Sequence, residues 1–197
     1  MKKLLLVLGV FASIVFASSV SAALIYVNDN GFYPSNELSS EVQYDLEGAN
    51  LSFTINNTSV IPSTITAFAF NAMGTVENYE GSWYLWDDPI TPPQKNKFGE
   101  DFKYGLSIFP SNWNGGNPGL GIKEGESQTF NFQVSDPFGL FDNAEGYSFI
   151  VRYQSVGFDG EGSDVGGSAV PIPGAALLLG SGMMGVLALR RRRLYSQ

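Results

Sequence analysis

The sequence contains neither cysteine nor histidine. Without cysteine the chain forms no disulfide, so its core and its hydrogen bonds must stabilise it alone. Without histidine there is no imidazole base for a Ser-His-Asp triad, and an ordinary zinc site lacks its usual ligands. What remains is carboxylate chemistry, either as oxygen ligands for calcium or as an acid/base pair. We expect no catalytic residue, no metal site and no cofactor.

Basic residues are also scarce outside the two ends of the chain. Residues 23–169 hold all nineteen Asp and Glu but only five Lys and Arg, which gives this part a net charge of −14. A basic footprint for nucleic acid is absent, and so is a polybasic patch for lipid. The acidity is explained by solubility outside the cell, with a cationic partner as the alternative.

The N-terminal residues have the pattern of a secretory signal peptide. Lys2 and Lys3 form a short basic region, and residues 4–16 are apolar. Small residues then precede a cleavage site, which we place between Ala22 and Ala23. The pattern predicts export with removal of residues 1–22 by signal peptidase.

The C-terminal residues combine a proline motif, an apolar span and an arginine cluster. The eighteen residues 172–189 carry no charge, near the lower limit of the ~17–25 that cross a bilayer as a helix. Residues 174–189 are the predicted transmembrane helix, whose outer boundary is marked by two prolines. The cluster stays on the cytoplasmic side. The motif consists of Val170, Pro171, Ile172 and Pro173, and the cluster of Arg190, Arg191, Arg192 and Arg193.

In this order and place, residues 170–193 resemble the PEP-CTERM sorting domain. The family motif is Pro-Glu-Pro, and here Ile172 stands in place of Glu. The resemblance implies a Gram-negative bacterium that makes exopolysaccharide, and cleavage near the motif by a membrane exosortase. The protein would pass through the inner membrane and end at the cell surface or in the extracellular matrix of a biofilm. If it is not cleaved, it remains a single-pass membrane protein.

The residues between the two signals read as one all-β domain. Apolar and polar residues alternate at 51–56, 127–134 and 147–153, which is the period of a half-buried strand. Segments 24–27 and 63–70 are further strands, and 42–46, 82–86 and 104–109 are weaker candidates, with Gly- and Asn-rich turns between them. We predict a single antiparallel β-sandwich over 23–156, with a jelly roll as one form of it.

Residues 157–169 are rich in Gly, Ser and acidic residues. This composition predicts a flexible acidic linker between the domain and the sorting signal. A calcium loop at 159–164 is the alternative, although the run does not match an EF-hand.

Residues 79–113 hold all three tryptophans among prolines, asparagines and glycines. Aromatic rings on loops can stack on sugars, while carboxylates and amides bond the hydroxyls; the alternative is that the rings fill the core. The candidates for sugar binding are Trp83, Trp86, Trp113, Asp87 and Asn112.

Three functions remain open. The first is a non-enzymatic surface or matrix protein associated with exopolysaccharide. The second is a carbohydrate-binding module, which requires some of the tryptophans to be exposed. The third is a glycosidase or lyase with a carboxylate pair, for which Asp87 and Asp88 are an adjacent pair near aromatics. Neighbours in a strand point to opposite faces, which disfavours this pair.

Overall fold

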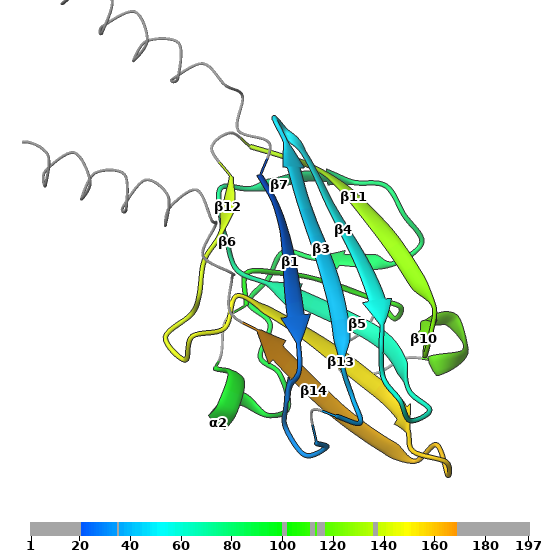
Figure 1. Cartoon of the computed structure of the whole chain (residues 1–197). Helices are drawn as coiled ribbons and strands as arrows, with labels where there is room; N and C mark the ends of the chain where they lie inside the picture. The colour runs from blue at the N-terminus through cyan, green and yellow to red at the C-terminus, as the bar shows by residue number, and fades with distance from the viewer. Residues whose placement is uncertain are drawn as a thin grey trace, which may run out of the picture.

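The computed structural model describes residues 21–34, 36–99, 102–110, 113, 117–135 and 138–168. Their strands form two antiparallel sheets that face each other (Figure 1), with a two-stranded ribbon of β6 (Ala72–Met73) and β12 (Gly139–Leu140) beside them. The prediction of an all-β, antiparallel, sandwich-like fold is confirmed.

The first sheet has one buried face and one face open to solvent. In β4 and β11, every second residue is buried, as the alternation of apolar and polar side chains predicts. In order of pairing, its strands are β1 (Ser21–Val27), β3 (Ser40–Glu47), β4 (Asn50–Asn57), β11 (Ser127–Val134) and β7 (Val76–Tyr79).

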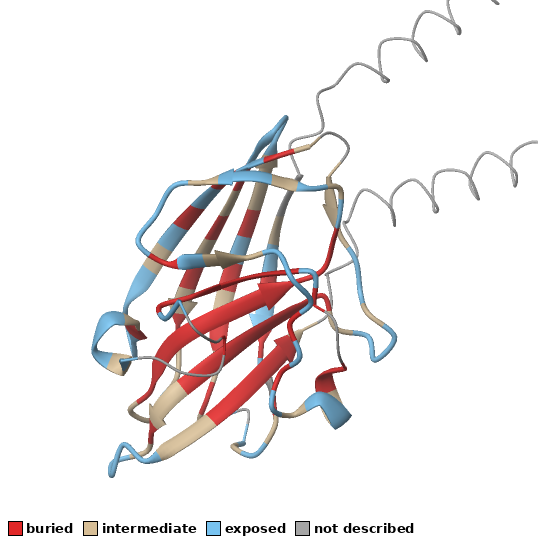
Figure 2. Ribbon diagram, turned by 180° about the vertical axis from the view of Figure 1, so that it is seen from behind, coloured by how far each residue is buried: buried red, intermediate tan, exposed pale blue. Residues whose placement is uncertain are grey.

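The second sheet is buried on both faces over its central strands, which appear as red bands in Figure 2. All seven residues of β5 are buried, and so are the first five of β13, so the half-buried strand expected at 147–153 is wrong. In order of pairing, its strands are β2 (Asp29–Asn30), β14 (Gly162–Ser168), β13 (Phe149–Val156), β5 (Thr64–Phe70), β9 (Tyr104–Ser107) and β8 (Tyr84–Trp86), and β10 (Ile122–Lys123) pairs with β5.

The main core lies between the sheets and is dominated by phenylalanine. Phe53 packs against Phe70 and Phe149 with ring centroids 5.0 and 5.2 Å apart. Phe68 packs edge-on against Phe130 at 4.8 Å. Phe53 and Phe130 come from the first sheet and the other three rings from the second, so the aromatic contacts join the two layers.

A second, smaller core explains why the outer face of the second sheet is buried. Ala67, Ala69 and Ile150 on that face are covered by Phe98 and Trp113. Both covering residues come from the segment between β8 and β10, which includes α2 (Lys95–Phe98) and the 3₁₀ turn η1 (Pro118–Leu120). Residues of this segment therefore cover the outer face of the second sheet.

The prediction of a flexible linker over 157–169 is wrong where the structure describes it. Residues 162–168 form β14, which pairs with β13 on one side and with β2 on the other. Its glycines permit close packing rather than flexibility, because a Cβ on Gly166 would lie 2.6 Å from Asn30 Oδ1 and one on Gly167 would lie 2.8 Å from the Phe98 ring. The domain thus extends to Ser168.

The two predicted targeting segments lie almost entirely outside the described residues. These are residues 1–20 of the signal peptide and, at the other end, the motif 170–173, the helix 174–189 and the arginine cluster. Among the residues that the structure does describe, no helix is long and apolar enough to cross a bilayer.

Candidate functional site

The tryptophans do not form the sugar-stacking platform that the sequence suggested. Trp83 is only 5% exposed and lies in the main core, 4.9 Å from the Phe130 ring. Trp113 is equally buried and donates a hydrogen bond from Nε1 to the carbonyl of Phe68 at 3.1 Å. Trp86 is half-buried and donates to Ser107 Oγ at 2.9 Å. The alternative, that these rings fill the core, is correct for Trp83 and Trp113.

The other two sugar-binding candidates add little to that surface. Asp87 is exposed in the segment after β8, and Asn112 lies outside the described residues. With two indoles buried and the third tied to Ser107, no stacking site assembles here among the residues described.

The outer face of the first sheet presents a different and more organised set of polar groups. The strand register aligns side chains from β3, β4 and β11 in rows that cross the sheet. These rows are Glu41–Asn56–Ser127, Gln43–Thr54–Thr129, Asp45–Ser52–Asn131 and Glu47–Asn50–Gln133. Every member is a carboxylate, an amide or a hydroxyl, so the whole face can exchange hydrogen bonds.

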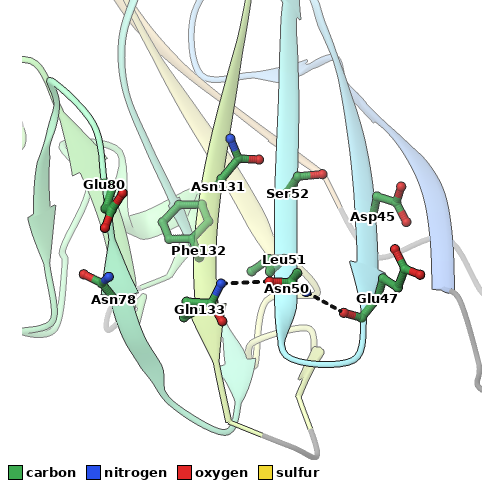
Figure 3. Close-up of a pocket in the computed structure, with 10 residues that line it drawn as sticks. All are labelled: Asp45, Glu47, Asn50, Leu51, Ser52, Asn78, Glu80, Asn131, Phe132 and Gln133. Atoms are coloured by element: carbon green, nitrogen blue, oxygen red, sulfur yellow. Dashed lines mark hydrogen bonds between the residues drawn. The ribbon is translucent and has the colours of Figure 1, made fainter.

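At one end of these rows the face is hollowed into a trough of about 400 Å³ (Figure 3). The polar walls are formed by residues of β3, β4 and β11, by Asn78 of β7 and by Glu80 directly after it. The chain at Leu51 and Phe132 forms the floor. Ten residues line this trough: Asp45, Glu47, Asn50, Leu51, Ser52, Asn78, Glu80, Asn131, Phe132 and Gln133.

A short chain of hydrogen bonds fixes the side chains at the trough's end. Gln133 Nε2 donates to Asn50 Oδ1 at 2.8 Å, and Asn50 Nδ2 donates to the Glu47 carbonyl at 3.4 Å (Figure 3). The Gln133–Asn50 pair is supported from the core side of the sheet, because Phe132, next to Gln133, is buried against Phe53 and Phe70. A rigid sheet with a packed reverse side therefore presents these amides in a fixed geometry.

The trough is acidic, with Asp45, Glu47 and Glu80 among its walls. The Oδ1 atom of Asp45 is shielded from solvent and has no hydrogen-bond partner among the described residues. Burial, together with the negative charge of Asp45, raises the pKa of Tyr44 to about 12. The three carboxylates can only accept hydrogen bonds, whereas the four amides of the lining both donate and accept, and this mixture suits a ligand rich in hydroxyl groups.

No group of three or more acidic side chains within the described ranges is placed to hold a metal ion. Asp164 belongs to the segment 159–164, for which a calcium loop was the alternative prediction. Its carboxylate is buried and is already engaged in hydrogen bonds. It accepts hydrogen bonds from the backbone N–H groups of Phe32 and Tyr33, both at 2.9 Å, and from Gln94 Nε2 at 3.3 Å. Asp164 is therefore a structural residue that ties the loop after β2 to β14.

The sequence pattern contains part of the trough but does not mark it as a site. The polar halves of the alternating runs at 51–56 and 127–134 include Ser52, Asn131 and Gln133. What the pattern could not provide is the pairing of β4 with both β3 and β11, which brings together strands about seventy residues apart in sequence.

Comparison with known proteins assigns no family. No protein-family model, no curated protein and no solved structure matches this chain. Function is therefore inferred below from the predicted targeting signals and from the trough.

Proposed function

We propose that the protein is an exported, non-enzymatic surface or matrix protein whose β-sandwich holds a polysaccharide in the trough of its first sheet. The observation that supports this most is the set of aligned polar rows around a trough of about 400 Å³. Amides and carboxylates in such rows match the dense hydroxyls of a sugar chain, which can both donate and accept.

The geometry favours an extended polymer over a small molecule. The trough lies on an open sheet face and runs across several strands, so it can follow successive sugar units (Figure 3). Hydrogen bonds made in contact with water contribute little each. Useful retention then comes from many weak contacts along one polymer and from many copies of the protein.

The targeting signals supply the location of this binding. The signal peptide directs export, and the motif at 170–173 with its apolar span and arginine cluster fits sorting by an exosortase. The protein would be an inner-membrane intermediate and then a component of the cell surface or the extracellular matrix. Its polymer partner there is the exopolysaccharide that such bacteria secrete.

Binding to the purified exopolysaccharide of the native host tests this function. Protein purified from that host should co-sediment with the polymer, and Asn131→Ala and Gln133→Ala should each weaken binding about fivefold, the effect of one lost hydrogen bond. Asn96→Ala is the matched control, because Asn96 is an exposed amide on α2, outside the trough. If the trough variants bind as well as the control, the trough is not the binding surface.

A further inference from the structure

Arg152 is the only arginine between residues 23 and 169, and it is buried. It lies on β13, opposite Ala67 of β5 and Val165 of β14. These two neighbours belong to the second core, so the arginine side chain enters the outer face of the second sheet. Only 8% of the residue remains exposed.

The guanidinium group is largely unsatisfied. Its Nη2 donates to Ser163 Oγ at 3.0 Å, but Nε and Nη1 are shielded from solvent and have no partner among the described residues. Burial lowers the pKa of Arg152, while the negative charge of Asp164 opposes that shift. Arginine nonetheless stays charged in proteins, so a buried positive charge here lacks a hydrogen-bonded counter-ion.

Asp164 does not fill that role, although it is the neighbouring residue to Ser163. Its oxygens accept hydrogen bonds from the N–H groups of Phe32, Tyr33 and its own neighbour Val165, and from Gln94. No hydrogen bond joins it to Arg152 in the part of the chain that the structure describes. The carboxylate next to Ser163 is thus committed to the loop after β2.

Two other polar side-chain atoms on β5 and β13, near Arg152 in the strand register, are also shielded and have no partner among the described residues. Thr66 Oγ1 belongs to the extra residue of a β-bulge, where the register with β13 shifts between Arg152 and Tyr153. Gln154 Oε1 lies two residues along β13, on the same face as Arg152. Within the described ranges, these neighbouring positions of β5 and β13 therefore carry two guanidinium nitrogens, a hydroxyl and an amide oxygen that have no hydrogen-bond partner.

We infer that Arg152, Ser163, Thr66 and Gln154 form a binding site for a single carboxylate group. The carboxylate oxygens would accept from the guanidinium and from the Thr66 hydroxyl, and they would neutralise the buried charge. One guanidinium beside Asp164 matches a monoanion better than a phosphate dianion. Gln154 Oε1 would accept from a hydroxyl next to the carboxylate, as in a uronic acid.

The site is separate from the trough, because it lies on the outer face of the other sheet. Gln154 and Ser163 are half-buried, so the site is reached from the side of the β13–β14 hairpin. A carboxylate could come from an acidic sugar or from a small organic acid. The proposal does not depend on polysaccharide binding in the trough.

Thermal unfolding of the full-length protein in detergent tests the site with sodium acetate and sodium glucuronate as probes, against sodium chloride at equal ionic strength and against glucose. We expect a saturable rise of about 2 to 4 °C in the unfolding midpoint with the carboxylates and none with the controls. Equal rises with both probes identify a simple carboxylate site, whereas a rise at much lower glucuronate concentration identifies an acidic sugar.

Two variants keep the test decisive. Arg152→Met conserves volume and removes the unpaired charge, so it should abolish the rise. Thr66→Val removes only the hydroxyl and should weaken the binding of both probes severalfold. Thr129→Val, on the outer face of the first sheet, is the matched control and should leave the binding of the probes unchanged. A rise that chloride reproduces, or that persists in Arg152→Met and Thr66→Val, would overturn the inference. Asn131→Ala in the trough should leave the rise unchanged.

Discussion

Asn57 is a fully buried amide that joins three loops at one end of the sandwich. Its Nδ2 donates to the carbonyls of Ser63 and Ile122 at 3.2 and 3.1 Å, and its Oδ1 accepts from the N–H of Ser59 at 3.3 Å. The loop after β4, the start of β5 and β10 are therefore held by one side chain. The backbone adds a further link, because the N–H of Gly125 donates to the Asn57 carbonyl at 2.8 Å.

Replacing this amide by a carboxylate keeps the shape and reverses the hydrogen-bond polarity. In Asn57→Asp an oxygen would face two carbonyl oxygens. Both carbonyls would lose the hydrogen bond from this amide, although the Ser63 carbonyl keeps the one from the Glu124 N–H. Two lost hydrogen bonds account for about 2 kcal/mol, and burial of an unpaired carboxylate or its forced protonation adds about 1 to 3 kcal/mol. We expect the free energy of unfolding to fall by about 3 to 5 kcal/mol, a large share of the usual ~5–15 kcal/mol.

Urea unfolding followed by tryptophan fluorescence measures this loss, since Trp83 and Trp113 are buried in the folded state. Asn56→Asp is the matched control, because Asn56 is the adjacent residue on the solvent-facing side of β4, opposite Glu41. There the same change should cost about 1 kcal/mol or less, from cross-strand repulsion. Equal losses in the two variants would refute the argument that the buried amide holds the loops together.

Two further predictions concern alkaline pH and processing. The raised pKa of Tyr44, about 12 against 10.0, means that its contribution to stability is complete below pH 10 and is lost as the pH rises towards 12. The free energy of unfolding, measured in urea, should therefore fall between pH 9 and pH 11.5, and Tyr44→Phe should make this fall about 2 kcal/mol smaller. An equal fall in the variant and the original protein would contradict the assigned shift. Intact mass of protein from the cell surface and medium should correspond to a chain that begins at Ala23 and ends near Pro171 or Pro173. A membrane-bound form that keeps residues 190–193 would instead make the C-terminus a simple anchor.

The fold could be predicted where local alternation decides it. Residues 127–134 were expected to form a strand with Phe130 and Phe132 inward, and β11 has these bounds and this face. The same argument failed for β13, whose second face, like that of the neighbouring β5, is covered by the segment between β8 and β10. That cover is a tertiary contact, and the pattern of apolar and polar residues within β5 or β13 does not predict it.

Composition is a poor guide to the structure at β14 and at the tryptophans. Gly166 and Gly167 suggested flexibility, yet they are glycines because other groups approach too closely for a Cβ. Trp83 and Trp113 lie among loop residues, but each reaches a core that is assembled from distant strands. In both cases the same residues fit two environments, and only the three-dimensional contacts decide between them.

The trough could be predicted only in part. The outward polar residues of β4 and β11 follow from alternation, but their alignment with Asp45 and Glu47 follows from strand pairing. Pairing between β4 and β11 joins residues separated by more than seventy positions, and a single sequence contains no direct record of it.

Side-chain amide signals in an NMR titration test the central claim most directly. Oligosaccharides released from the host's own exopolysaccharide would be added to the ¹⁵N-labelled protein. Binding in the trough predicts saturable shifts of the side-chain amides of Asn50, Asn131 and Gln133, with the amide of Asn96 unchanged. Unchanged signals from all three trough amides, or shifts confined to other surfaces, would contradict the account.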